Sequence, residues 1–296
     1  MGLRVANGPV SWGVDLPNKP GVPPWEEVFS EIGEAGYRWC ELGPVGYLPD
    51  DDDLVGAELR ARDLSVAGSY VFEPMHDKSK HGEIELVTRR TCRRIAGLGG
   101  TYLVVIDMVS DERGATGGRT RDAHRLAGEN YRDLLAGVRL VASIAAEHGL
   151  MPVLHPHVGS YIEFEDEVER MLSDTFDDGL QLCIDTGHFA YAGIEPVGFL
   201  ARHRDRVRYL HFKDIDPDVH ERVLDGAVGF FDAISLGVFC PVGRGVVDFA
   251  GLAEELKHGF DGPGTVEQDR DVRSGTTPLE DAKASLAFLR ELGLAD

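Results

Sequence analysis

The amino-acid sequence predicts an α/β fold, a (β/α)8 barrel that residues 1–296 form as a single domain. Two observations lead to this prediction: short apolar runs alternate with longer amphipathic stretches, and eight of each occur. Strands that alternate with helices imply parallel pairing and right-handed crossovers, and eight such units suit a chain of 296 residues. The competing architecture is a doubly wound open sheet, but no GxGxxG motif follows the first apolar run.

Eight runs have the length and composition of strands. They are Arg4–Trp12, Tyr37–Leu42, Ser65–Phe72, Tyr102–Asp107, Met151–His157, Leu180–Asp185, Val207–Phe212 and Gly264–Gln268. Helical stretches begin near Pro24, Asp53, Gly82, Thr120, Glu165, Pro196, Asp248 and Thr277. The stretch from Thr120 to Glu147 has apolar residues at helical spacing and stops at His148-Gly149. Residues 215–242 are too long for an ordinary loop, so we expect an insertion between the seventh strand and seventh helix that holds short helices and covers the site.

Composition and charge exclude several classes of protein. The chain has 30 Lys and Arg against 51 Asp and Glu, a formal net charge of −21, which disfavours nucleic acids and anionic membrane surfaces as partners. No apolar run reaches the roughly 18 residues of a membrane-spanning helix, and the N-terminal segment does not resemble a secretion signal. The four cysteines form no CxxC pair, so we expect free thiols. These observations together predict a cytoplasmic protein.

Polar side chains follow the apolar runs where each run ends. His155, Asp185, His211 and Glu267 come from four consecutive strands, and the C-terminal ends of the strands form the catalytic face of such a barrel. Mixed imidazole and carboxylate ligands suit a divalent cation, and we expect Mn²⁺ or Co²⁺ before Zn²⁺, Fe²⁺ or Mg²⁺. Each residue alone has a structural alternative: Asp185 would cap the next helix, and Glu267 would be a surface acid.

Other residues near the strand ends are candidates for substrate contacts. Trp12 and Phe72 would form an apolar wall against a sugar ring, or would serve packing alone. Glu41 would contact the substrate or be a polar residue inside the barrel. Arg244 lies in a Gly-Arg-Gly loop and would contact a substrate oxygen or point into solvent. Lys213 follows His211 by two positions and therefore points to the same side of the strand, where it would transfer a proton, orient a substrate oxygen, or form a salt bridge with a carboxylate.

Several segments resemble the xylose-isomerase-like TIM-barrel superfamily of sugar isomerases and epimerases. They are Asp185-Thr-Gly-His188, Ala192-Gly193, His211-Phe-Lys-Asp214 and Glu267-Gln-Asp269. Within that superfamily the chain is most similar to the inosose (2-keto-myo-inositol) dehydratases. The residues that carry this similarity are His155-Pro-His-Val-Gly159, Glu163, Gly237-Val-Phe239, Gly243, Gly245, Val247-Asp-Phe249 and Val266-Glu-Gln-Asp269.

The resemblance implies a ligand set and an activity. Asp185, His211 and Glu267 match the ligands of the last three barrel strands, whereas the superfamily commonly has Glu where His155 stands. The fourth ligand is therefore open to His157 or Glu163, and the opening segment and the Gly-Arg-Gly loop also depart from the dehydratase pattern. The implied enzyme is a metal-dependent lyase that dehydrates a keto-polyol such as 2-keto-myo-inositol through an enediolate, with the metal as Lewis acid.

Roles for the remaining candidates follow from this chemistry. Glu163, His188 and Lys213 are the candidate general acids and bases, His157 is a candidate substrate contact, and His188 would alternatively support a metal ligand by a hydrogen bond. An isomerase or epimerase of a keto-sugar or sugar-derived ketone shares the first step and is the alternative, ahead of a non-catalytic sugar-binding protein. The expected partner is a small sugar or cyclitol, and the resemblance suggests a homodimer.

Overall fold

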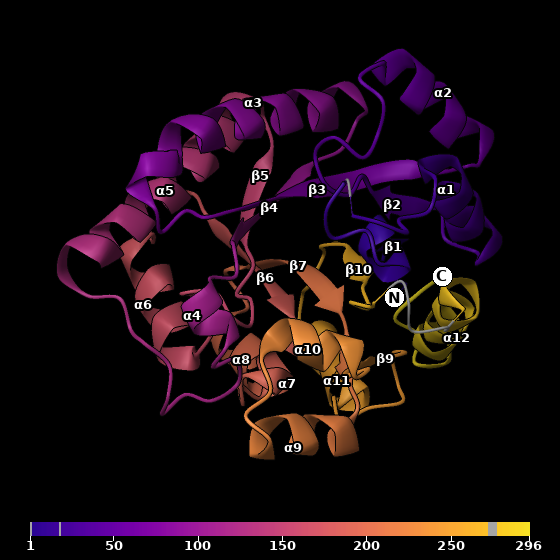
Figure 1. The fold of residues 1–296 in the computed structure, drawn as a ribbon. Coiled ribbons are helices and arrows are strands. Elements are labelled where there is room, and N and C mark those ends of the chain that lie inside the picture. The colour runs from indigo at the N-terminus through magenta and orange to yellow at the C-terminus, as the bar shows by residue number, and fades with distance from the viewer. Residues whose placement is uncertain (1, 18, 272–276) are drawn as a thin grey trace.

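The computed structural model describes residues 2–17, 19–271 and 277–296, and it confirms the predicted barrel. Within these residues eight parallel strands close in the order β1-β10-β7-β6-β5-β4-β3-β2 (Figure 1). They are β1 (Val5–Asn7), β2 (Trp39–Glu41), β3 (Ser65–Glu73), β4 (Tyr102–Asp107), β5 (Met151–Leu154), β6 (Gln181–Asp185), β7 (Val207–Phe212) and β10 (Gly264–Val266). Leu3 forms a bridge with Ala295, which brings the two ends of the chain together.

Helices surround the barrel (Figure 1). The longer ones are α1 (Trp25–Glu34), α2 (Asp52–Ala61), α3 (His81–Gly97), α5 (Gly128–Glu147), α6 (Glu165–Asp174), α8 (Pro196–His203), α11 (Phe249–Leu256) and α12 (Pro278–Glu291). Short helices precede or follow several strands: η1 (Pro9–Trp12), η2 (Lys78–Lys80), α4 (Asp111–Gly114) and α7 (Thr186–Tyr191). No helix among the described residues is both long and apolar enough to cross a membrane.

Several predicted limits differ from the structure: the strand expected at Met151–His157 ends at Leu154, and the two largest differences are at the first strand and at the helix expected from Thr120. The first strand ends at Asn7, and residues 9–12 form η1, because Pro9 has no N–H to donate to a strand partner. The helix expected from Thr120 begins instead at Gly128, and its buried face starts at Tyr131. The residues between Thr120 and Gly128 are mostly polar and offer no apolar face to bury, so they remain in a loop.

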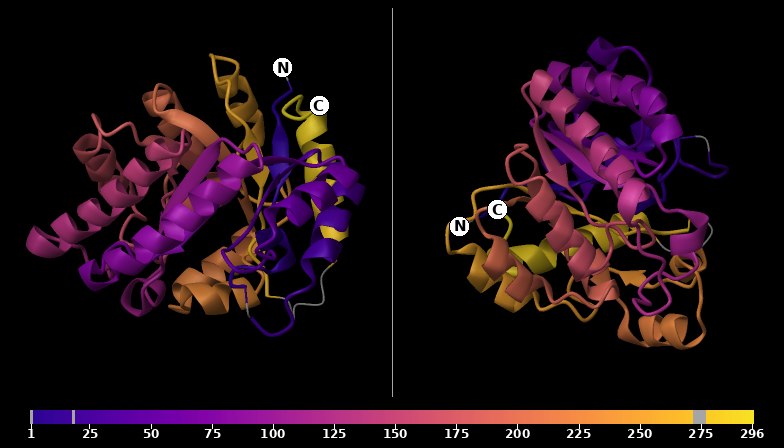
Figure 2. Two further views of the ribbon diagram at one scale, coloured as in Figure 1. Left: turned by 90° about the horizontal axis from the view of Figure 1, so that it is seen from above. Right: turned by 90° about the vertical axis from the view of Figure 1, so that its left-hand side faces the viewer.

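The predicted insertion after the seventh strand is present and has an apolar core of its own. It contains β8 (Asp214–Ile215), α9 (Pro217–Asp225), α10 (Phe230–Ser235) and β9 (Phe239–Cys240), and β8 pairs with β9 antiparallel. Phe230 and Phe239 pack with Tyr191 of α7. Figure 2 (left) shows the two termini at one end of the barrel and the orange segment with α9 and α10 at the other. The insertion therefore stands over the C-terminal ends of the strands.

Alternation along the strands divides the core into two sets. Outward-facing residues such as Leu210 and Phe212 pack against helices in the larger cluster. Inward-facing residues such as Cys183 and Tyr209 belong to a smaller cluster inside the barrel. The same inward register continues to Asp185 on β6, so the last inward position of that strand is polar. All four cysteines have free thiols, as expected.

Candidate metal centre and active site

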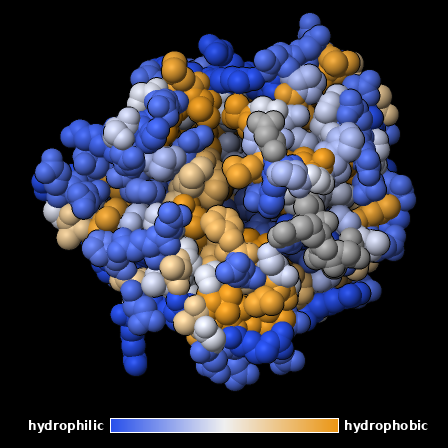
Figure 3. Space-filling model, in the orientation of Figure 1, coloured by the Kyte–Doolittle hydropathy of each residue, from blue (hydrophilic) through white to orange (hydrophobic). Residues whose placement is uncertain are grey.

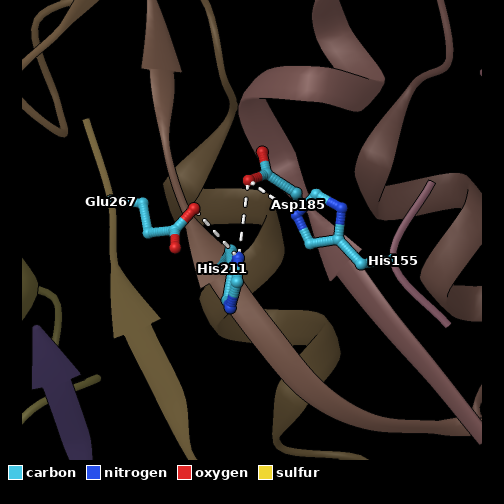
Figure 4. A group of neighbouring side chains, drawn as sticks. All are labelled: His155, Asp185, His211 and Glu267. Carbon is cyan, nitrogen blue, oxygen red and sulfur yellow. Dashed lines mark hydrogen bonds and ion pairs between the residues drawn. The ribbon is translucent and has the colours of Figure 1, made fainter. Parts of the chain in front are cut away.

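Four of the predicted residues meet at the C-terminal end of the barrel (Figure 4). His155 follows β5, Asp185 ends β6, His211 lies in β7 and Glu267 follows β10. These strands are consecutive neighbours in the barrel, and Asp185 is in direct register with His211. One ligand atom from each of the four lies within 4.8 Å of the others, and all four side chains are buried.

The distances within this cluster are short. Asp185 Oδ2 lies 3.3 Å from His155 Nε2 and 3.7 Å from His211 Nδ1, and Glu267 Oε2 lies 3.1 Å from His211 Nδ1. Figure 4 shows the two carboxylates and the two imidazoles pointing toward one another. Parallel strands therefore supply two oxygen and two nitrogen ligands around a common point.

Glu41 fixes the orientation of His211 from below. Its Oε1 accepts hydrogen bonds from the Tyr209 hydroxyl at 2.8 Å and the Thr265 hydroxyl at 2.9 Å, and it lies 3.0 Å from His211 Nε2. A carboxylate that receives the N–H of one ring nitrogen leaves the other nitrogen free to act as a ligand. The structure therefore places Glu41 inside the barrel as a positioning residue for His211, and it does not line the cavity above.

The residues present fit a divalent cation. His211 Nδ1 is buried and has no hydrogen-bond partner among the described residues, although it faces two carboxylates. A buried nitrogen without a partner is costly unless something else satisfies it. Two imidazoles with two carboxylates are the donor set of sites for Mn²⁺, Co²⁺, Zn²⁺ and Fe²⁺.

Lys213 lies at the edge of the same cluster. Its Nζ is 3.1 Å from Asp185 Oδ2, 3.2 Å from Glu267 Oε2 and 3.1 Å from Asp269 Oδ2, and the side chain is buried. Burial alone would lower the pKa of Lys213, but these carboxylates raise it above its ordinary value, so the amine is charged. Of the salt bridges expected for Lys213, the one with Glu267 is present. Asp214 instead accepts backbone N–H groups from the Gly-Arg-Gly loop.

Two histidines stack beside Lys213. The ring centroids of His157 and His188 are 3.9 Å apart, and His188 Nε2 accepts a hydrogen bond from Lys213 Nζ at 3.0 Å. Burial, the neighbouring imidazole and the Lys213 charge hold the pKa of His188 well below its ordinary value. Burial and neighbouring positive charge likewise lower the pKa of His157 to about 3. Both imidazoles are therefore neutral near pH 7.

Asp269 completes the floor of the site, and the sequence reasoning missed it. Burial raises its pKa to about 6, together with the negative charges of Glu267 and Asp185 and against the Lys213 charge. Asp269 follows Glu267 by two positions, so the spacing argument that placed Lys213 beside His211 also applies here. That signal was available in the sequence.

A cavity of about 500 Å³ opens above these residues. Its polar lining residues include His155, His157, Lys213, Glu267 and Asp269. Phe72 also lines the cavity, which is the position expected for an apolar wall against a sugar ring.

Three predicted site residues lie away from both the cavity and the residues of the metal centre beneath it. The Trp12 indole N–H donates to Glu31 at 2.6 Å and its ring packs in the core, because the η1 turn directs it away from the barrel mouth. Arg244 is exposed to solvent in its loop. Trp12 therefore serves packing, and Arg244 points into solvent, which are the structural alternatives to a substrate contact.

Glu163 is the third of these residues and is held in a separate cluster. Its carboxylate accepts hydrogen bonds from the backbone N–H groups of Gly118 at 2.6 Å and Gly159 at 3.0 Å, and from Arg113 at 3.1 Å. Both oxygens are thus occupied by neighbours that join two loops. The structure assigns Glu163 to loop anchoring, and it does not bring it to the metal ligands or the cavity.

Relatives of known description match nearly the whole chain. The rhizopine catabolism protein MocC of Rhizobium meliloti is 29% identical over 297 residues, covering 100% of this chain and 90% of its own. An inosose dehydratase of Geobacillus thermodenitrificans is 28% identical over 292 residues, covering 98% of this chain and 97% of its own.

Solved structures share the fold at lower identity. The probable 3-DHS dehydratase AsbF of Bacillus anthracis has a TM-score of 0.73 at 14% identity, covering 98% of this chain and 99% of its own. The IOLI protein with a binding zinc atom has a TM-score of 0.72 at 15% identity, with 98% of each chain covered. A D-allulose 3-epimerase of Methylomonas sp. in complex with D-allulose has a TM-score of 0.69 at 18% identity, covering 98% of this chain and 96% of its own.

The family comparison agrees with the barrel. Residues 29–292 match the xylose isomerase-like TIM barrel family. The chain belongs to that family.

Proposed function

We propose that this protein is a divalent-metal-dependent dehydratase of a keto-polyol such as 2-keto-myo-inositol. The observation that carries the proposal is the buried cluster of two histidines and two carboxylates at the floor of a cavity, beside a charged lysine. The full-length relatives named inosose dehydratase support this substrate class. The relatives and structural neighbours together support an enzyme that modifies a sugar-type substrate as a dehydratase or an isomerase.

His155, Asp185, His211 and Glu267 would hold the cation. When bound, the cation supplies Lewis acidity to an oxygen of the substrate. The mixed nitrogen and oxygen donors favour Mn²⁺ or Co²⁺, with Zn²⁺, Fe²⁺ and Mg²⁺ as further candidates; a neighbour of the same fold binds zinc.

The side chains around the cluster supply the proton transfers. Dehydration breaks a C–H bond next to the carbonyl, forms a carbon–carbon double bond and releases the β-hydroxyl with a proton as water. His188 does not line the cavity, but its Nε2 lies 3.0 Å from Lys213 Nζ and 3.6 Å from Asp269 Oδ2, and this position beside the cluster makes it the candidate to receive the proton from carbon. Lys213 and Asp269 carry the groups that can deliver a proton to the departing hydroxyl, and the Lys213 charge offsets the negative charge that develops on the substrate.

The test is turnover of 2-keto-myo-inositol by chelated protein and by the same protein reloaded with Mn²⁺ or Co²⁺. Elimination produces a conjugated product, so ultraviolet absorbance follows it directly. We expect turnover in the reloaded protein and none in the chelated one, and equal turnover in both would refute the proposal. Incorporation of deuterium from solvent without an absorbance change would identify an isomerase or epimerase instead, since those reactions share only the first step.

A further inference from the structure

The cavity changes character from its floor to its mouth. The floor is formed by the charged and imidazole groups of the metal centre. Toward the mouth, separate segments supply apolar side chains: Leu16, Phe72, Met108, Val109, Phe231 and Ile234. Figure 3 shows an apolar patch over α10, next to the hollow at the centre of this face.

Packing accounts for only part of this apolar surface. Phe230 anchors α10 in the core of the insertion, whereas its neighbour Phe231 is 57% exposed. Leu16 reaches the same cavity from the loop after η1 and is 49% exposed. Exposed apolar side chains that gather at one cavity differ from scattered ones, because grouped patches mark ligand-binding surfaces.

The cavity is also larger than one cyclitol requires. A ring of six carbons that carries six oxygens fills at most roughly 360 Å³, at the liquid-water share of about 30 Å³ for each non-hydrogen atom. The cavity holds about 500 Å³. If the ring binds at the polar floor, the remaining volume lies along the apolar wall.

Most polar side chains that line the outer cavity bond to other side chains; Arg270 pairs with Asp281 at 2.9 Å, and Asp232 is the exception among the described residues. Lys19 forms an ion pair with Asp15 at 3.0 Å, and the Ser235 hydroxyl donates to Asp271 at 2.9 Å. A second sugar ring would need several polar partners at this level, and these four side chains already bond in pairs. The chemistry of the mouth therefore suits an apolar group better than another polyol.

From these observations we infer that the outer cavity is a subsite for an apolar substituent, an aryl or alkyl group, carried by the keto-polyol substrate. The inference rests on the proposed function for the ring itself. Leu16 and Phe231 would cover the substituent from two sides, while the ring reaches the metal centre.

The test uses probes that cannot react because they lack a carbonyl. Monobenzyl and monomethyl ethers of myo-inositol are titrated into the metal-loaded protein by calorimetry. Burying the phenyl ring against the apolar wall should make the dissociation constant of the benzyl ether at least roughly tenfold lower than that of the methyl ether. Equal constants for the two ethers would overturn the inference.

Matched variants locate the effect. The double variant Leu16→Ala/Phe231→Ala should bring the benzyl-to-methyl ratio close to one. The control Leu86→Ala/Phe176→Ala removes the same two residue types from side chains that are 70% and 71% exposed and lie outside the cavity lining. The control should keep the full ratio, and a loss of the ratio in both double variants would also overturn the inference.

Turnover of 2-keto-myo-inositol separates this inference from the proposed function. Turnover together with equal ether affinities refutes the apolar subsite alone. No turnover, together with a benzyl preference that depends on Leu16 and Phe231, refutes the proposed reaction and leaves the subsite standing. If neither ether binds, the subsite is refuted as well.

Discussion

Two buried clusters of acidic and basic side chains occur among the described residues, and they differ in how well their carboxylates are balanced by donors. In the first, Arg113 binds Glu163 and Glu167, and all four carboxylate oxygens accept hydrogen bonds. In the second, three carboxylates surround the single ammonium of Lys213, and the buried His211 Nδ1 has no hydrogen-bond partner among the described residues.

This difference separates a structural cluster from a functional one. The Arg113 cluster joins the loop after α4 to the start of α6, and its carboxylates are saturated by hydrogen bonds, although Arg113 Nε is buried without a partner among the described residues. The Lys213 cluster has three carboxylates around one ammonium and an imidazole nitrogen that faces two of those carboxylates, and a divalent cation would bind all of these donors. The sequence did not distinguish the two clusters, because Glu163 and Lys213 were both predicted as candidate catalytic groups.

The largest expected effect is on the metal centre. Asp185→Asn should abolish metal binding and lower kcat/KM by about 10³-fold or more, because an amide is a weak metal ligand and the centre depends on all four donors. Elemental analysis and turnover of 2-keto-myo-inositol measure the two effects. Asp269→Asn is the control: it should lower turnover but retain the metal, because Asp269 lies outside the four-ligand set. Full metal content in Asp185→Asn would contradict the assignment.

The Arg113 cluster should show the opposite behaviour. Glu163→Gln should lower the free energy of unfolding by about 3 kcal/mol, since it leaves part of the Arg113 charge buried without its partner. Metal content should remain that of the wild type. The comparison variant Glu165→Gln alters an exposed glutamate on the same helix start and should change stability by less than about 0.5 kcal/mol. Loss of metal in Glu163→Gln would return this residue to the active site.

A smaller effect on metal affinity is expected from a change at Glu41, which contacts His211. Glu41→Gln should weaken metal affinity by about 10- to 100-fold, because His211 loses the carboxylate that orients its ring. Turnover of Glu41→Gln should recover at saturating metal. Substitution of one of the four metal ligands should not allow such recovery. Competition with a metal-binding dye measures the affinity, and unchanged affinity would show that Glu41 serves the barrel interior alone.

The smallest effect concerns pH. Burial alone would raise the pKa of Glu167, but the Arg113 guanidinium holds it below its ordinary value. A carboxyl whose pKa is lower in the folded state stabilises the protein above the pKa of the unfolded chain, and this contribution is lost as pH falls through the folded pKa. The stability difference between wild type and Glu167→Gln should therefore be constant from pH 6 to 7 and shrink by about 1 kcal/mol or more as pH falls below roughly 4. Denaturant unfolding at several pH values measures it, and a difference independent of pH would exclude the ionised pair as its source.

The strands and most helices were predictable because their signals are local. The limits predicted for the strands at Tyr102–Asp107 and Val207–Phe212 match those observed, since a buried strand reads as a continuous apolar run. The expected helix start at Thr120 was wrong, because helical spacing in the stretch that follows says little about where the helix begins. The first strand was predicted too long because an apolar run continues through Pro9 into a tight turn.

The pattern of apolar runs and amphipathic stretches was enough to predict the barrel and the four polar residues at the ends of neighbouring strands. Strand alternation fixes which side chains face inward, and strand order fixes which of them are neighbours. The two-residue spacing from Glu267 already pointed to Asp269, but the roles of two other acids depended on the fold. Glu41 lies beside His211, whereas Glu163 is held by Arg113. The physical reason is that barrel closure and loop anchoring bring together residues from distant segments, and no local pattern in the chain encodes these contacts.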